Sequence, residues 1–174
     1  IFTRTKVFNL KQILILYKID ILIMRTVSIQ NINEFLDCET IVVAGASRKP
    51  ASFSAEAIKH LTLQGYKTIP INVNIPDNEL PQGWYNSFDI LPVEVSNLLV
   101  LTNYKVTDSV IDKAVEIGFK QIWIQQKSDT KYAIEKAENS GANVIHGKCI
   151  IMFTNPTGFH KFHYYLTKIF KRLP

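Results

Sequence analysis

The sequence has few of the features that would assign it to a class at once. Its 174 residues contain two cysteines, Cys38 and Cys149, so far apart that they indicate no disulfide framework and suit a reducing compartment. The apolar stretch within residues 1–23 is interrupted by Lys18 and Asp20, so it lacks the about 20 consecutive apolar residues that span a bilayer. We therefore expect a cytoplasmic protein with no membrane segment.

The chain has the length and composition of one domain. The first methionine is Met24, and the residues before it follow no helix-capping pattern. We expect Met24 to be the natural start and residues 1–23 to be a non-native or disordered leader. Residues 24–174 are expected to form a single domain, because 47% of the sequence is apolar and can build a sizeable core.

The net charge of +5 suits an anionic ligand. The lysines and arginines are spread along the chain and are not interleaved with aromatic residues in the manner of a nucleic-acid-binding module. We therefore expect a small anionic ligand and no nucleic acid as partner.

Apolar runs alternate with helical patterns from residue 27 onward. The run at 41–44 does not alternate with polar residues, which indicates a strand buried on both faces of a parallel sheet. This pattern predicts an α/β, Rossmann-like fold: a five-stranded parallel sheet with helices on both faces, plus a C-terminal amphipathic helix. The strands are predicted at 41–44, 67–73, 98–102, 121–124 and 143–146. The helices are predicted to start at Asn31 or Asn33, Ser54, Thr107, and Ser128 or Asp129, with a last helix at 156–173.

The loop that follows the first strand is typical of an anion site. Gly45 permits a tight turn, Arg48 and Lys49 add two cations, and the helix predicted from Ser54 begins shortly afterwards. A helix N-terminus presents unpaired N–H groups and the positive end of the helix dipole, so such a loop can hold a phosphate. The alternative is a tight strand-to-helix turn without a ligand.

Two familiar phosphate-binding patterns are missing from this loop. A dinucleotide site has three glycines after the first strand and a carboxylate at the end of the second, whereas this chain has only Gly45 and then Asn72. The nucleotide-triphosphate loop needs a second glycine before Lys-Ser or Lys-Thr, which is also missing. NAD and a phosphoryl-transfer reaction are therefore disfavoured.

Four segments together carry a resemblance to a known family. They are residues 42–47 with Lys49 and Pro50, residues 69–72, residues 99–103 and residues 123–126. Over about residues 39–149, and in the following tail 147–153, the chain resembles the small CoA-binding proteins whose fold is that of the CoA-binding domain of the succinyl-CoA synthetase alpha subunit.

The resemblance implies coenzyme A or an acyl-CoA as ligand, with the phosphates at the loop after the first strand. The implied binding residues are Gly45, Ala46, Ser47, Arg48, Lys49, Ser52, Asn72, Thr102, Asn103, Gln125 and Gln126. Asn72, Thr102 and Asn103 could equally cap loops. One departure from the family is Val73, where the family usually has proline, so the adenosine wall is expected to differ. A homodimer or a partner enzyme is a possible assembly.

Catalysis is not implied by this resemblance. The ligase relatives use a further domain with a phosphorylated histidine, for which this chain has no room. The alternative is an enzyme that uses a nucleotide-like cofactor, either NAD-type or with thiol chemistry at Cys149. His146 with Cys149, and His160 with His163, have spacings possible for zinc, although surface or hydrogen-bonded histidines are the more ordinary interpretation.

Overall fold

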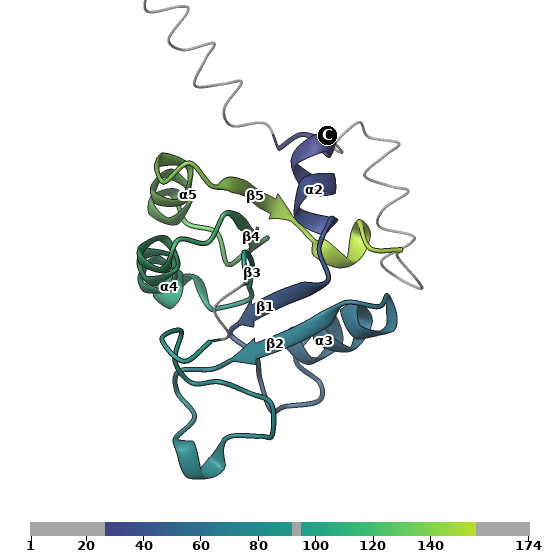
Figure 1. The fold of residues 1–174 in the computed structure, drawn as a ribbon, viewed down its shortest axis with the longest axis vertical. Helices are drawn as coiled ribbons and strands as arrows, with labels where there is room; N and C mark the ends of the chain where they lie inside the picture. Colours follow the sequence, from purple (N-terminus) through teal and green to yellow (C-terminus); the bar gives the residue numbers. More distant parts are fainter. Residues whose placement is uncertain (1–26, 92–94, 156–174) are drawn as a thin grey trace, which may run out of the picture.

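The computed structural model describes residues 27–91 and 95–155. A five-stranded sheet in the order β2-β1-β3-β4-β5 runs through the centre of the domain, and every neighbouring pair of strands is parallel. Figure 1 shows this sheet between two groups of helices. The strands are β1 (Thr40–Ala44), β2 (Lys67–Ile71), β3 (Asn97–Val100), β4 (Gln121–Gln125) and β5 (Asn143–Lys148).

Strand β1 is buried on both faces, as the lack of alternation predicts. Ile41, Val42, Val43 and Ala44 are each at most 1% exposed. Val42 and Ala44 belong to one hydrophobic cluster, and Ile41 and Val43 belong to another. Because successive side chains of a strand point to opposite faces, β1 separates two cores.

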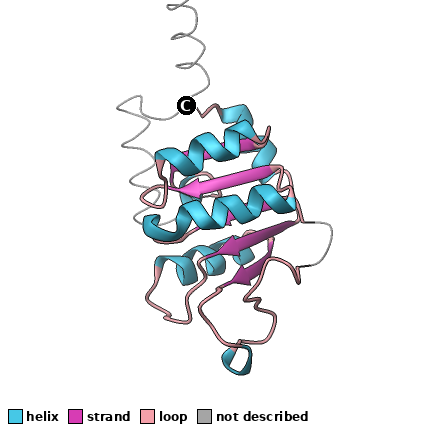
Figure 2. Ribbon diagram, turned by 90° about the vertical axis from the view of Figure 1, so that its left-hand side faces the viewer, coloured by secondary structure: helices cyan, strands magenta, loops and turns pink. Residues whose placement is uncertain are grey.

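Helices cover both faces of the sheet. Helices α4 (Tyr104–Ile117) and α5 (Lys131–Asn139) pack on one face, the one that Figure 2 views from the front. Helices α2 (Ile29–Leu36) and α3 (Phe53–Leu63), with the 3-10 turn η2 (Ile150–Met152), cover the other face. The predicted α/β fold with its five-stranded parallel sheet is therefore confirmed, whereas the predicted helix at 156–173 lies outside the described residues.

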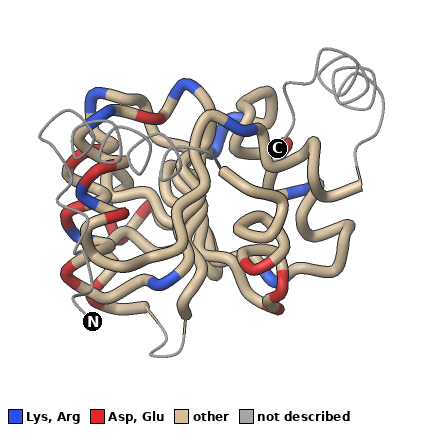
Figure 3. The backbone as a smooth tube through the Cα atoms, turned by 90° about the horizontal axis from the view of Figure 1, so that it is seen from above, with Lys and Arg blue, Asp and Glu red and all other residues tan. Residues whose placement is uncertain are grey.

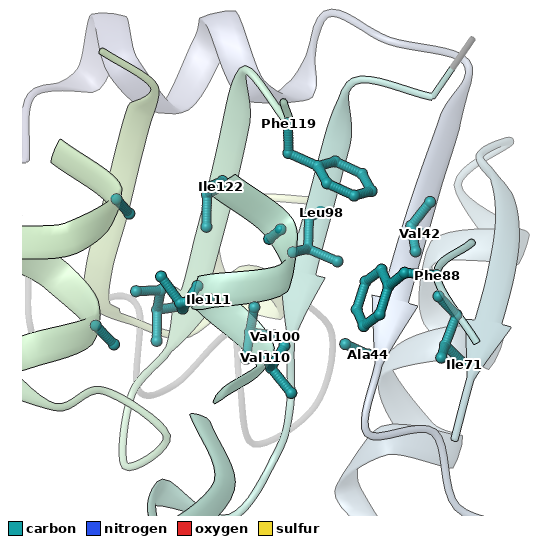
Figure 4. Packing of buried hydrophobic residues seen from close by; sticks show 14 of the residues in the cluster. Val42, Ala44, Ile71, Phe88, Leu98, Val100, Val110, Ile111, Phe119 and Ile122 are labelled. Carbon is teal, nitrogen blue, oxygen red and sulfur yellow. The ribbon is translucent and has the colours of Figure 1, made fainter. Parts of the chain in front are cut away.

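The connection from β2 to β3 has a different form from the helical crossovers. Its regular element within the described residues is a single 3-10 turn, η1 (Asp77–Glu79). Phe88 from this connection enters the core beside Val42 and Ile71, as Figure 4 shows. It meets Phe119 edge-on, with ring centroids 6.2 Å apart. Phe88, with the partly buried Tyr85, Leu91 and Val95, thus covers part of the sheet where a crossover helix would otherwise pack.

The predicted starts of the helices are wrong by a few residues. In each case an earlier or later polar side chain accepts a hydrogen bond from a first-turn amide, which defines the cap. The observed N-caps are Ser28 for α2, Ser52 for α3, Asn103 for α4 and Thr130 for α5. Strand ends differ too: β2 stops at Ile71 and β3 at Val100, while β5 continues to Lys148.

Charges of both signs lie together on the helices α4 and α5 (Figure 3). Lys113 pairs with Glu116 at 3.1 Å, and Lys136 lies 3.4 Å from Asp112. These two helices therefore present charges of mixed sign, partly joined in ion pairs. Among the helices of residues 27–91 and 95–155, none is both long enough and apolar enough to cross a bilayer.

Candidate functional site

The order of the strands makes the carboxyl ends of β1 and β3 the place where a ligand crevice is expected. The chain leaves β1 toward α3 on one face of the sheet and leaves β3 toward α4 on the other face. In open parallel sheets, ligands bind where two such connections diverge, outside the carboxyl ends of the strands. This point of divergence is therefore where a site is expected.

Gly45 draws the loop after β1 against the loop after β3. Its φ of +86° is favourable only for glycine, and an added Cβ would lie 2.8 Å from the Thr102 nitrogen and 2.9 Å from the Leu101 carbonyl. Next to it, the Leu101 N–H donates to the Ala44 carbonyl oxygen at 2.8 Å. The first and third strands therefore end in backbone contact.

The amides of Gly45 and Ala46 are used by the fold. Both donate to the carbonyl oxygen of Ile71, at 3.0 and 3.1 Å. The Asn72 side-chain amide donates back to the Ala46 carbonyl oxygen at 2.7 Å, and its oxygen accepts from the Asn74 N–H at 3.0 Å. These bonds fix the turn, so the groups left to face a ligand begin at Ser47. Asn72 lies at the end of the second strand, where a dinucleotide-binding site has a carboxylate. Here its side chain stabilises the turn.

Serine side chains join the loop to the start of α3. The Ser47 N–H donates to the hydroxyl of Ser54, which is 3.3 Å from the hydroxyl of Ser52. Ser52 caps the helix by accepting from the Ala55 N–H at 3.2 Å. The first-turn amides of Phe53 and Ser54 have no acceptor in the part of the chain that the structure describes. The loop thus leads directly to a helix end with unpaired donors.

Two exposed cations follow Ser47. Lys49 is exposed, and its N–H donates to the Ser47 hydroxyl at 3.2 Å. Arg48 is half-exposed and pairs with Glu79 at 3.0 Å. Hydroxyl, guanidinium, ammonium and helix-end amides are the donors that phosphate groups accept from, so the chemistry of this loop fits a polyphosphate ligand.

Thr102 and Asn103 have structural partners at the other wall of the crevice. The Thr102 hydroxyl lies 2.8 Å from that of the buried Thr107. The Asn103 side chain accepts from the Lys105 N–H at 3.0 Å and so caps α4. Asn103 therefore acts as a cap, as one of the two alternatives predicted. Ligand binding by Thr102 or Asn103 stays a prediction.

Gln125 and Gln126 lie away from this cluster of residues. Gln125 ends β4 and Gln126 follows it, and β3 separates β4 from β1. Gln125 is 4% exposed, and its side-chain oxygen accepts from the Ile150 N–H at 3.2 Å. Lys148, whose carbonyl oxygen accepts from the Gln126 N–H, is a further cation at this edge, and partial burial lowers its pKa.

Cys149 is 2% exposed and belongs to the hydrophobic cluster between the sheet and α3. A thiol in this position is shielded from any ligand in the crevice. Within 27–91 and 95–155, no three histidine, cysteine or acidic side chains gather as metal ligands. His160 and His163, the other half of the zinc alternative, lie outside the described residues.

Sequence reasoning did not identify Glu79, Ser54 and Thr107 as parts of this region. Ser54 was expected to cap α3, yet it is 6% exposed and its hydroxyl accepts from the Ser47 N–H in the loop after β1. Glu79 is 31 positions from Arg48 and carries no local signal of their contact. Only the closeness of Ser52 and Ser54 to the glycine turn could have suggested that more than one serine braces the loop.

The fold defines a Rossmann-like α/β domain in which the loop after β1, with its cations Arg48 and Lys49, lies at the divergence of β1 and β3. Residues 39–155 match the family model of a CoA binding domain, and the chain belongs to this family. The matched range contains the whole sheet and every residue of the loop.

Solved structures share the fold. A hypothetical protein from Pyrococcus horikoshii is 24% identical, over 72% of this chain and 88% of its own, with a TM-score of 0.64. A conserved hypothetical protein from Pyrococcus furiosus is 29% identical, over 67% of this chain and 99% of its own, with a TM-score of 0.60. A protein from Thermus thermophilus is 19% identical, over 71% and 93%, with a TM-score of 0.62.

Proposed function

We propose that this protein binds coenzyme A or an acyl-CoA at the crevice between β1 and β3, without catalysing a reaction on it. The phosphates are held by the loop from Ser47 to Ser52 and by the first turn of α3. Membership of the CoA binding domain family supports the ligand, and the donor groups of the loop support its location.

The observation that carries this proposal is the backbone contact at Gly45. An added Cβ there would meet Thr102 at 2.8 Å, so the loop after β1 is held at the point where ligands bind to open parallel sheets. The same loop presents the cation of Lys49 and leads into the first-turn amides of α3. A diphosphate ester is the natural anion for such a set of donors.

The remaining predicted residues have unequal support. Thr102 lies against Gly45 and Asn103 caps α4, and we propose that both residues border the path of the ligand. Gln125 and Gln126 lie one strand further away, and Gln125 is buried. We propose that these two residues shape the side of the site that is farthest from β1.

A binding role is preferred to thiol chemistry because Cys149 is buried in the core. We propose that the protein works in the cytoplasm and supplies CoA to a partner enzyme, or acts as a homodimer. The binding experiment below is the same for either assembly, because it measures only the contact between CoA and the loop.

Calorimetric titration tests the proposal. We expect CoA to bind, 3′-dephospho-CoA and ATP to bind more weakly, and NADH to give no heat of binding. Replacing Lys49→Ala is expected to weaken CoA binding by about tenfold, because it removes a charge-assisted contact to phosphate. The matched control is Lys67→Ala, which removes the same charge at the exposed first residue of β2, at the opposite edge of the sheet.

Two results would contradict the proposal. Equal affinity of wild type and Lys49→Ala for CoA would remove the loop as the phosphate site. Binding of NADH with the affinity of CoA would favour the alternative enzyme with a nucleotide-like cofactor.

A further inference from the structure

The guanidinium of Arg48 is already in contact with a carboxylate. Its Nη1 lies 3.0 Å from Glu79 Oε2, and the two side chains are 50% and 51% exposed. Arg48 belongs to the loop after β1, and Glu79 ends the 3-10 turn that follows β2. Because β1 and β2 are parallel neighbours, this ion pair joins two loops at the carboxyl edge, beside the proposed phosphate loop.

The turn that presents Glu79 is braced by the fold. The Glu79 N–H donates to the Pro76 carbonyl oxygen at 2.9 Å, and the side-chain amide of Asn86 donates to the carbonyl oxygen of Ile75 at 3.2 Å. Ile75 itself is 5% exposed, so it anchors the turn in the core. The backbone that carries Glu79 is therefore fixed by contacts that do not involve Arg48.

The ion pair can be exchanged for a phosphate contact. A half-exposed pair of this kind changes an equilibrium by at most about fivefold, since water solvates both groups well when they separate. Phosphate oxygens accept two parallel hydrogen bonds from one guanidinium, and the phosphates of coenzyme A together carry more charge than one carboxylate. A ligand phosphate near Ser47 and Lys49 would therefore compete with Glu79 for Arg48.

We infer that Glu79 regulates the phosphate site by holding Arg48 until a phosphate group displaces it. This inference rests on the proposed function, since it concerns the same loop and the same ligand. Glu79 weakens the binding of ligands whose phosphate must take Arg48 from it, and it leaves unchanged the binding of ligands that do not reach Arg48. It acts through Arg48 and is a positioning residue.

The test is a set of CoA titrations on Glu79→Gln, Arg48→Ala and the double variant. We expect Glu79→Gln to raise CoA affinity about threefold to fivefold, because Arg48 no longer has a competing carboxylate. In the Arg48→Ala background the same replacement should have little effect, since the double-mutant cycle isolates the contact between the two residues. The control Asp77→Asn removes the same charge from the same turn, where the partner is Asn86. It should change CoA affinity less than Glu79→Gln does.

Each outcome separates the two ideas. If wild type binds CoA while Glu79→Gln binds it equally or more weakly, the inference is overturned and the proposed function stands. If Asp77→Asn raises affinity as much as Glu79→Gln does, the effect is one of general charge and the inference also fails. If no variant binds CoA, the proposed function fails and the inference with it. Both Glu79 and Asp77 are exposed, and an unchanged melting temperature will show that the variants are folded.

Discussion

Gly45 holds a backbone position that no other residue could take without a change in the site. Two separate features restrict this position to glycine: the positive φ, and the 2.8 Å distance between an added Cβ and the Thr102 nitrogen. A glycine at a helix end can have the first feature without the second. Gly118, for example, has a φ of +93° at the end of α4 with nothing within 4 Å of an added Cβ. The two glycines therefore allow conformational strain and steric contact to be measured separately.

We predict that Gly118→Ala lowers the free energy of unfolding by about 1–2 kcal/mol, the cost of a left-handed conformation for an L-residue. Gly45→Ala should lower it by about 3 kcal/mol or more, because the new Cβ also meets backbone that cannot rotate away. Chemical denaturation of both variants checks this difference, and equal losses would show that the chain relaxes around position 45. If Gly45→Ala weakens CoA binding and Gly118→Ala does not, the close contact between Gly45 and Thr102 is needed for the proposed CoA site.

Helix caps illustrate how elements are positioned. Ser28, Ser52, Asn103 and Thr130 each accept a hydrogen bond from an amide in the first helical turn. Two of these caps, Ser52 and Asn103, lie in the loops that meet at the crevice. The same side chains therefore set where α3 and α4 begin, and they belong to the residues that we propose to border the ligand.

We predict that Asn103→Ala lowers the free energy of unfolding by about 1 kcal/mol, the usual loss for a helix cap. Asn103→Asp should keep the stability, since a carboxylate accepts from the Lys105 N–H equally well and favours the positive end of the helix. Urea denaturation measures both. If Asn103→Asp is as unstable as Asn103→Ala, the amide group does more than cap α4, and a change in CoA affinity would indicate contact with the ligand.

The elements themselves could be predicted with fair accuracy from the sequence, and their ends could not. The burial of β1 on both faces appears as an unbroken apolar run, and the helices appear as apolar residues at helical spacing. The first residue of a helix, however, depends on which of several polar side chains turns back to an amide. Thr107 was predicted as a cap, yet its hydroxyl bonds the Asn103 carbonyl oxygen from inside the first turn of α4.

At the scale of the whole molecule, the amino edge of the sheet contains a group whose protonation is linked to stability. Cys38 lies between α2 and β1 and lines a cavity of about 400 Å³ with Tyr66. Burial, and to a lesser extent the Asp37 carboxylate, raise the pKa of Cys38 from 9.0 to about 11. Burial and the neighbouring thiol also raise the pKa of Tyr66.

We predict that the protein loses stability between pH 9 and 11. The folded state holds the Cys38 proton more tightly than the unfolded chain, so the stabilisation is complete below pH 9 and is lost as the pH rises through 11. The difference in pKa between the unfolded and the folded state corresponds to about 2.7 kcal/mol of stability. Solvent screening of this partly exposed thiol reduces the expected loss to about 1 kcal/mol. Urea denaturation at both ends of this range measures the loss. The Cys38→Ser variant, which cannot ionise there, should lose less, and an equal loss would assign the effect to other groups.

The amino-acid sequence by itself determined the α/β class, the parallel sheet and the family, because hydrophobic periodicity and short motifs are local properties of the chain. It also indicated the loop after β1, since glycine, cations and a helix start lie within ten residues. Only the tertiary structure decided which groups of that loop remain available, because their partners come from other strands. The Gly45 and Ala46 amides bond to Ile71, and Arg48 pairs with Glu79, 31 residues away. Hydrogen bonds and ion pairs between distant segments depend on how the strands lie side by side, and no local pattern encodes that arrangement.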